Sequence, residues 1–124
     1  MEIRQRTGTQ MPLLRSAASM SYRVRKADAN QPETVEYLRK LGWAVHHTHM
    51  VGSGYPDLHV SKRIHGFPWS CLIELKMPGK KLTQDEQVFA EEFEGSLLVC
   101  YGPEDCAEKL LREANHHWLC YKGT

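Results

Sequence analysis

The chain has 124 residues and a mass of 14.3 kDa, enough for one domain with a single modest core and too little for two. Hydrophobic residues make up 41% and charged residues 25% of the sequence, which excludes collagen-like, low-complexity and wholly disordered chains. No apolar run approaches the roughly 20 residues that span a bilayer, and no secretory signal follows Met1. We therefore expect a cytoplasmic protein that has no membrane partner.

The cysteine spacing bears on redox state and on zinc binding. No two of the four cysteines form a Cys-x-x-Cys pair, which argues against a zinc ribbon and gives little reason to expect disulfides. We predict reduced, mostly buried thiols at Cys71, Cys100, Cys106 and Cys120. Structural zinc is an alternative, although its candidate ligand sets are incomplete and far apart: His47 with His49, and His116 and His117 with Cys120.

Charge divides the chain into two parts. Residues 1–27 hold six basic residues and one acidic residue, a net charge of +5, whereas residues 28–124 hold 10 basic and 14 acidic residues, a net charge of −4. The first part is rich in Ser, Thr, Gln and Arg and lacks periodicity, so we predict a basic, disordered arm that can rest on a polyanion. Three alternatives stay open: a solubilising tail, a transit peptide, or sequence upstream of a true start at Met11 or Met20.

The segment after the arm has the pattern of an amphipathic helix. Asn30 can cap this helix and Gly42 ends it. Apolar residues recur at helical spacing at Val35, Leu38 and Leu41. One helix is therefore expected to cover part of the core.

Three strands follow, which we predict over residues 43–48, 57–61 and 69–76. The turn-rich segment 52–56 separates the first two strands, and segment 62–68 is expected to form a hairpin loop between the second and the third. These strands form an antiparallel meander.

The remaining pattern adds helices and one more strand. Residues 83–86 form a capping box that opens a helix, and Gly95 closes it. The apolar run 97–101 suits a strand covered on both faces, and Pro103 begins a last helix that reaches residue 114. The order α-β-β-β-α-β-α predicts an α/β domain over residues 28–114, in which helices flank a mixed sheet. Residues 115–124 are expected to be a C-terminal tail or an edge strand.

Three charged residues mark the ends of two neighbouring strands. Asp57 follows a proline at the head of one strand, and Glu74 and Lys76 share one face at the tail of the next. Antiparallel pairing would place Asp57 beside Glu74. Two adjacent carboxylates repel unless a cation joins them, and hard oxygen ligands suit Mg²⁺ or Mn²⁺. An exposed ion pair at a strand end and a turn residue after proline are the alternative interpretations.

Four motifs in order resemble those of one nuclease superfamily. They are 54–58 (GYPDL), 73–76 (IELK), Leu82-Thr83 with Gln87, and 28–33 (DANQPE), which looks like a first-helix motif. Together they resemble the PD-(D/E)XK nucleases, specifically small phage-type and VRR-NUC-like members close to Holliday-junction resolvases. The resemblance covers about residues 28–111 and implies a restriction-endonuclease-like αβββαβ core.

The resemblance also assigns roles to residues. It implies that Asp57 and Glu74 hold Mg²⁺ or Mn²⁺, with Glu33 as an added ligand from the first helix and the carbonyl of Leu75 within reach. Lys76 would orient water and stabilise charge on the phosphate, and Gln87 matches a glutamine near the active site. Helical geometry alone does not choose Glu33 over Glu36, which lies equally far from the apolar stripe; only position in the motif favours Glu33.

The implied function is a metal-dependent endonuclease that hydrolyses phosphodiester bonds in duplex or branched DNA. Its setting would be recombination, repair or phage DNA processing, in a bacterium or a phage-infected host cell. DNA is expected to contact the arm and two basic pairs near the site, Lys62 with Arg63 and Lys80 with Lys81. The alternative is a catalytically silent DNA-binding or assembly module with a nuclease fold.

A homodimer is expected, because cutting both strands of a duplex or a symmetric junction needs two sites and this chain supplies one. The apolar stretch 118–121 (WLCY) is the candidate contact, since it would otherwise lie exposed. The alternative is that this stretch is a short edge strand covering its own core.

Overall fold

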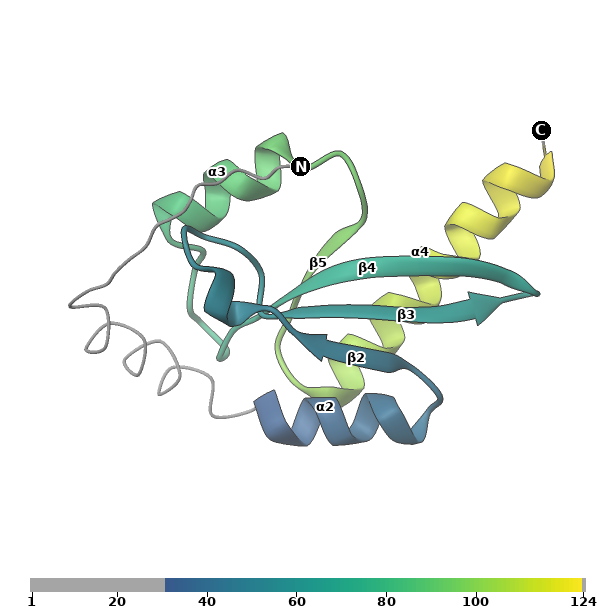
Figure 1. Ribbon diagram of the computed structural model, residues 1–124, viewed down its shortest axis with the longest axis horizontal. Helices are drawn as coiled ribbons and strands as arrows, with labels where there is room; N and C mark the ends of the chain where they lie inside the picture. Colours follow the sequence, from purple (N-terminus) through teal and green to yellow (C-terminus); the bar gives the residue numbers. More distant parts are fainter. Residues whose placement is uncertain (1–30, 124) are drawn as a thin grey trace.

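The computed structural model describes residues 31–123 as an α/β domain (Figure 1). Its helices are α2 (Gln31–Lys40), α3 (Gln84–Glu92) and α4 (Pro103–Gly123), and a short 3-10 helix, η2, spans His49–Val51. Its strands are β2 (Ala44–His47), β3 (Leu58–Ile64), β4 (Phe67–Leu75) and β5 (Leu97–Cys100). The predicted α/β class and element order are confirmed, whereas the basic arm 1–27 and the Asn30 cap lie outside the described residues.

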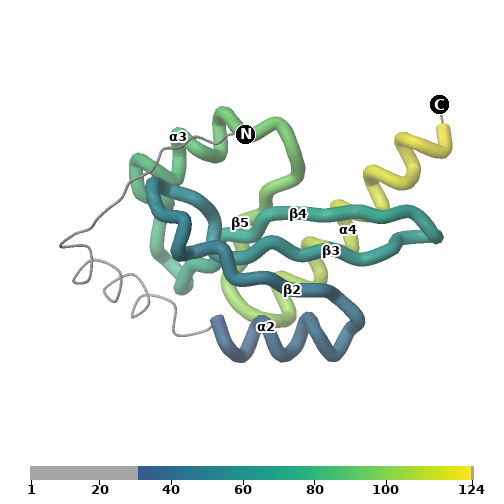
Figure 2. The backbone as a smooth tube through the Cα atoms, in the orientation of Figure 1, coloured from purple at the N-terminus to yellow at the C-terminus, as the bar shows by residue number. Residues whose placement is uncertain are grey.

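The four strands form one mixed sheet in the order β2-β3-β4-β5. Neighbouring strands are antiparallel from β2 to β4, and β5 runs parallel to β4 after the crossover through α3. Figure 2 shows α2 running alongside β2, while α3 stands at the end of the sheet where β3 begins and β4 ends. Asp57, at the start of β3, and Glu74 and Lys76, at the end of β4, lie at that end of the sheet.

The hydrophobic core lies between the sheet and helices α2 and α4. Alternate residues of β4 face this core, and Cys71, Ile73 and Leu75 are each at most 2% exposed. They meet side chains of both helices in one cluster, among them Val35, Leu38, Cys106 and Leu110. Because side chains alternate along a strand, Glu74 points to the opposite face of the sheet.

The hairpin between β3 and β4 is longer than predicted. The strands pair up to Ile64 and Phe67, so the turn is only His65-Gly66 rather than the whole segment 62–68. Both turn residues have positive φ, 52° and 87°. This conformation fits two-residue hairpins because its twist matches that of the strands, and a histidine at the first position gives little signal in the sequence.

Helix α4 corrects the expectation for the C-terminal residues. It continues without a break to Gly123, so residues 115–123 form neither a tail nor an edge strand. No glycine or proline interrupts the sequence there, and Ala114, Trp118 and Tyr121 recur at helical spacing. The rings of Trp118 and Tyr121 lie 5.4 and 5.0 Å from that of Phe67 on the hairpin. Contacts with the chain's own hairpin therefore hold this segment.

Other details of the elements agree or differ in small ways. Leu41 lies beyond the end of α2 and is 45% exposed, so it does not extend the apolar stripe. The Thr83 capping box is confirmed, and α3 ends at Glu92, before Gly95. The thiols are free as predicted, with Cys120 alone exposed. Among residues 31–123 no helix is long and apolar enough to cross a bilayer.

Candidate active site

The two predicted carboxylates lie side by side at the open end of the β3–β4 hairpin. Leu58 pairs with Ile73 in the antiparallel register, which places Asp57 beside Glu74. The backbone N–H of Asp57 donates to the carbonyl of Ile73 at 2.9 Å, and Asp57 Oδ2 accepts from the N–H of Leu75 at 2.8 Å. The sheet itself therefore fixes the orientation of the Asp57 carboxylate, and the predicted juxtaposition is confirmed.

Both carboxylates are buried, at 5% exposure each, on the face of the sheet opposite the main core. Segment 52–56 and helix α3 cover this region. Gly54 has a φ of +82°, and a Cβ there would collide with the backbone carbonyl of Asp85 at the start of α3. The ring of Tyr55 also packs edge-on against that of Phe89, with 4.9 Å between the centroids. Glycine at position 54 thus allows α3 to lie close to the site.

Lys76 supplies the positive charge of the site. Its backbone N–H donates to the carbonyl of Cys100 at 2.9 Å, so β5 anchors the end of β4. Its Nζ lies 3.5 Å from Glu74 Oε2 and 2.8 Å from Glu86 Oε1. Lys76 therefore joins the carboxylate of β4 to one from α3.

Glu86 is the residue of this site that the sequence analysis missed. Its Oε1 accepts from the N–H of Thr83 at 2.8 Å, as the capping box predicts, and the same oxygen meets Lys76. A capping box turns the side chain of its third residue back toward the helix start. That signal is local, and it points to the site only once the position of α3 is known.

Burial and mutual repulsion shift the protonation of these groups. Burial first, and then the nearby Asp57 and Glu86, raise the pKa of Glu74 to about 9, and Lys76 offsets this only in part. Burial would also raise the pKa of Glu86, but its hydrogen bonds to Lys76 and Thr83 lower it. The pKa of Lys76 is raised, because its contacts with Glu86 and Glu74 outweigh its burial. Glu74 and Glu86 thus share one ammonium group, and Asp57 lies beside Glu74.

This donor set fits a hard divalent cation. Asp57 and Glu74 offer carboxylate oxygens next to each other, and the excess negative charge favours a cation. Within residues 31–123, no three His, Cys, Asp or Glu side chains are grouped as ready metal ligands. An ion here would complete its shell with water, as Mg²⁺ commonly does, and with carbonyls such as that of Leu75.

The helix residues that the motifs point to are all exposed. Glu33 is exposed in the first turn of α2 and belongs to no such group. Glu36 is also exposed and lies 3.6 Å from Lys40. Gln87 is exposed on α3, next in sequence to Glu86. Beside Glu74, the carboxylate that contacts Lys76 is that of Glu86 on α3.

The two basic pairs lie in different places. Lys62 pairs with Trp69 toward the hairpin turn, five residues or roughly 16 Å along β3 from Asp57, so the expectation that it borders the site is wrong. Its Nζ donates to the carbonyl of Leu41 at 2.8 Å, and Arg63 Nη1 donates to that of Gly66 at 2.8 Å. By contrast, Lys80 and Lys81 are exposed in the segment between Lys76 and α3.

The alternative zinc sets are not assembled. His47 and His49 have ring centroids 6.2 Å apart, and His49 lies in η2 rather than on the strand. On α4, His116 Nε2 lies 3.7 Å from Cys120 Sγ, while His117 bonds Glu113. Neither pair gains a third ligand from the described part of the chain.

Comparisons with protein-family models, with curated proteins and with solved structures give no match for this chain. The chemistry of the site is therefore inferred from its own residues and from the sequence motifs that contain them.

Proposed function

We propose that this protein is a metal-dependent endonuclease that hydrolyses phosphodiester bonds in DNA, with a PD-(D/E)XK active site. The observation that supports this most is the burial of Asp57 and Glu74 side by side, with Lys76 within 3.5 Å of Glu74. Burying two carboxylates is costly, and a solvated strand end would not require it. A site that binds a cation and acts on phosphate would explain why both carboxylates are buried despite this cost.

Each residue has a distinct role in this mechanism. Asp57 and Glu74 would hold Mg²⁺ or Mn²⁺, which when bound polarises the phosphate and lowers the pKa of water. The N–H of Leu75 keeps one oxygen of Asp57 directed along the strand end, which orients this ligand. Lys76 brings a positive charge toward the negative charge that develops on the phosphate.

Glu86 acts as a positioning residue for Lys76. The ammonium is 2.8 Å from Glu86 and 3.5 Å from Glu74, so the helix carboxylate holds it at the edge of the site. Capping geometry fixes Glu86 in turn. The amine is therefore ordered before any substrate arrives, which lowers the entropic cost of placing it.

A cleavage assay tests this function. The full chain is incubated with supercoiled plasmid, flaps and four-way junctions, with Mg²⁺, Mn²⁺ or EDTA. We expect cleavage with the metals, none with EDTA, and none for Asp57→Asn, whereas the exposed control Glu108→Gln cuts like the parent. DNA binding without cleavage of any substrate would instead support the catalytically silent module.

We also propose that a second copy completes the cut of both strands. Leu119 on α4 is 62% exposed and offers an apolar contact, whereas Trp118 and Tyr121 pack on the chain's own hairpin. Light scattering at micromolar concentration should give twice 14.3 kDa. A monomer that still cuts both strands at one place would contradict this.

A further inference from the structure

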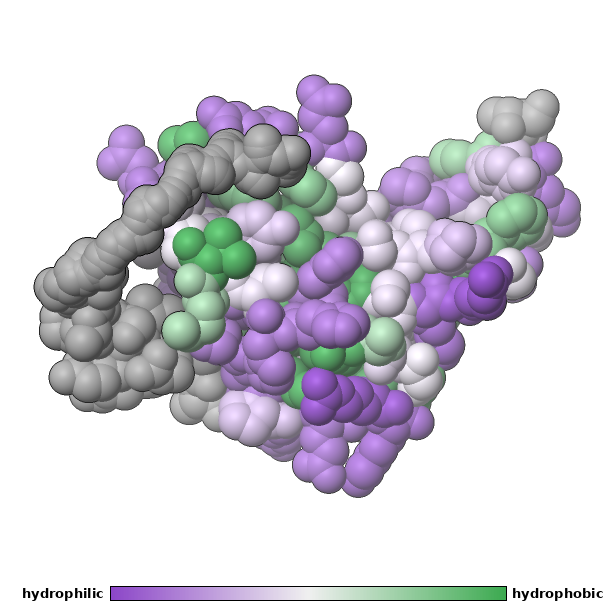
Figure 3. Space-filling view, in the orientation of Figure 1, coloured by the Kyte–Doolittle hydropathy of each residue, from purple (hydrophilic) through white to green (hydrophobic). Residues whose placement is uncertain are grey.

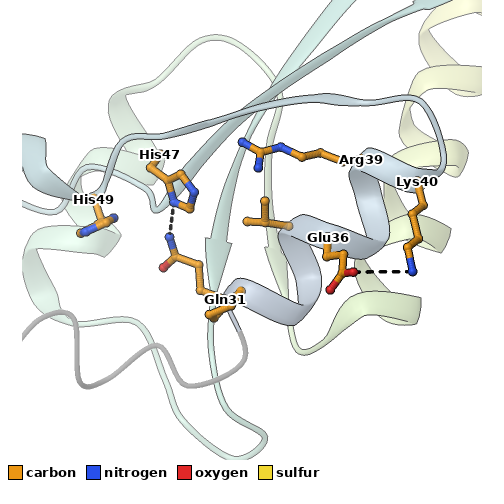
Figure 4. A pocket seen from close by; sticks show the side chains of 8 residues that line it. Gln31, Glu36, Arg39, Lys40, His47 and His49 are labelled. Carbon is orange, nitrogen blue, oxygen red and sulfur yellow. Dashed lines mark hydrogen bonds and ion pairs between the residues drawn. The ribbon is translucent and has the colours of Figure 1, made fainter.

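A groove lies between helix α2 and strand β2, apart from the carboxylate site. It has a volume of about 650 Å³. The polar side chains that line it are Gln31, Glu36, Arg39 and Lys40 of α2 with His47 and His49 (Figure 4). Hydrophilic side chains gather over α2 and β2 in the space-filling view (Figure 3). We call this feature the α2–β2 groove.

The groove presents hydrogen-bond donors. Gln31 is buried at 6% exposure, and its Nε2 lies 2.7 Å from His47 Nδ1. With Gln31 as the donor, the neutral imidazole carries its proton on Nε2. Burial first, and then the charge of Arg39, lower the pKa of His47, in agreement with a neutral ring. His49 Nδ1 is buried and has no hydrogen-bond partner among the described residues.

The charge of the groove is positive. Arg39 Nη2 donates to the carbonyl of Val45 at 3.0 Å, which holds the guanidinium beside β2 and leaves further N–H donors. Lys40 and Glu36 form an exposed pair 3.6 Å apart, with 75% and 71% of the side chains exposed. Such a pair is weak, so an anion can compete for Lys40. The groove therefore has two cationic side chains, Arg39 and Lys40, and one carboxylate, Glu36.

The groove borders the carboxylate site across the edge of the sheet. His47 pairs with Leu58, the residue after Asp57. The next residue, Thr48, donates from its N–H to the carbonyl of Asp57 and from Oγ1 to that of Pro56, both at 2.8 Å. β2 is an edge strand of the described sheet, so the groove and the carboxylate site lie on opposite faces of the sheet near the same end.

We propose that the α2–β2 groove binds the phosphodiester backbone of the DNA strand that is cut, through Arg39 and Lys40 with the imidazoles of His47 and His49. This inference rests on the proposed function for the identity of the ligand. Repeated anionic groups along a strand match a groove that offers two cations and two imidazoles near the end of β2. Elsewhere in the described chain, Lys109 and Arg112 pair with carboxylates one turn away on α4, and Lys62 and Arg63 lie toward the hairpin turn, whereas Lys80 and Lys81 are exposed between Lys76 and α3.

The test measures DNA binding separately from cleavage. Fluorescence anisotropy follows a labelled oligonucleotide duplex or junction with the full chain in EDTA, at several salt concentrations. The variant Arg39→Gln/Lys40→Gln removes both charges, while the glutamine at position 39 can still donate to Val45. The matched control is Arg112→Gln, which removes an exposed cation paired with Glu108 on α4 at similar exposure.

We expect the groove variant to bind about tenfold more weakly at low salt, with a slope of log K against log salt lower by about one to two. The control should bind like the parent. Loss of binding in a protein that never cuts DNA would support the groove while overturning the nuclease. Unchanged binding and slope in a protein that does cut would overturn the groove alone.

A second measurement does not depend on the stability of the variant. The imidazole NMR signals of His47 and His49 in the parent are followed during titration with the oligonucleotide and, separately, with inorganic phosphate. Shifts with the oligonucleotide at micromolar concentration support the proposal. Shifts with inorganic phosphate alone assign the groove to a free anion and overturn it.

Discussion

The two ends of the β3–β4 hairpin are built on opposite principles. At the open end, Asp57 and Glu74 are buried on the face away from the core, and burial, followed by repulsion from Asp57 and Glu86, raises the pKa of Glu74 to about 9. At the turn, Phe67 stays 45% exposed and simply packs against the aromatic rings of α4. The turn end stabilises the fold, whereas the open end costs stability. A site that keeps such a cost is expected to serve function.

The largest effect should follow from changes at the open end. Asp57→Asn and Glu74→Gln should each lower metal-supported cleavage by about a thousandfold or more, since each removes a charged oxygen ligand of the cation. Both variants should keep the parent's far-ultraviolet circular dichroism. Cleavage at the parental rate by both would show that the site lies elsewhere.

A smaller loss of cleavage is expected when Lys76, or Glu86 that positions its ammonium, is changed. Lys76→Ala should lower turnover while leaving metal affinity close to that of the parent. Glu86→Gln should lower turnover about 10- to 100-fold, in the range for partners that orient a functional group. The pH profile separates the two roles, because only Glu86→Gln retains an amine that titrates. Equal rates for Glu86→Gln and the exposed α3 control Glu91→Gln would remove Glu86 from the mechanism.

Stability should report the cost of the buried carboxylates. Glu74 binds its proton more tightly when folded, so the metal-free protein loses stability as pH rises from about 5 toward 9. Glu74→Gln should lack this decline and exceed the parent by about 2–3 kcal/mol at pH 8 in EDTA. Chemical denaturation at pH 5 and pH 8 measures the difference. The same pH dependence in parent and variant would contradict the assigned shift.

The turn end should show the reverse behaviour. Trp118→Ala removes ring contacts with His65 and Phe67, and should lower the free energy of unfolding by about 1–2 kcal/mol. Cleavage per folded molecule should not change, because the active site lies at the other end of the hairpin. A large loss of turnover at unchanged stability would show that the two ends are coupled.

Much of this architecture can be predicted from local pattern. Strand alternation and the chain order place Asp57 beside Glu74, since antiparallel pairing leaves little other choice. The length of the hairpin could not be predicted, because His65 is an unusual residue for a left-handed turn position. The extent of α4 was missed because the apolar stretch 118–121 suits an edge strand as well as a helix, and the contacts with Phe67 that favour the helix come from a residue distant in sequence.

The composition of the site was harder to predict than its position. Glu86 contacts Lys76 only because Gly54 lets α3 approach closely, which is a tertiary effect. Glu33 was favoured by its position in a motif, yet its side chain is exposed on α2. Lys62 lies near the site in sequence but points its Nζ to Leu41 near the other end of the hairpin.

Metal titration tests the central claim most directly. Isothermal calorimetry with Mn²⁺ on the full chain compares the parent, Asp57→Asn, Glu74→Gln and the exposed control Glu108→Gln. We predict that the parent and the control bind Mn²⁺ with the same affinity, and that both site variants lose this binding. Equal Mn²⁺ affinity in all four proteins would contradict the assignment of the buried carboxylates to a cation.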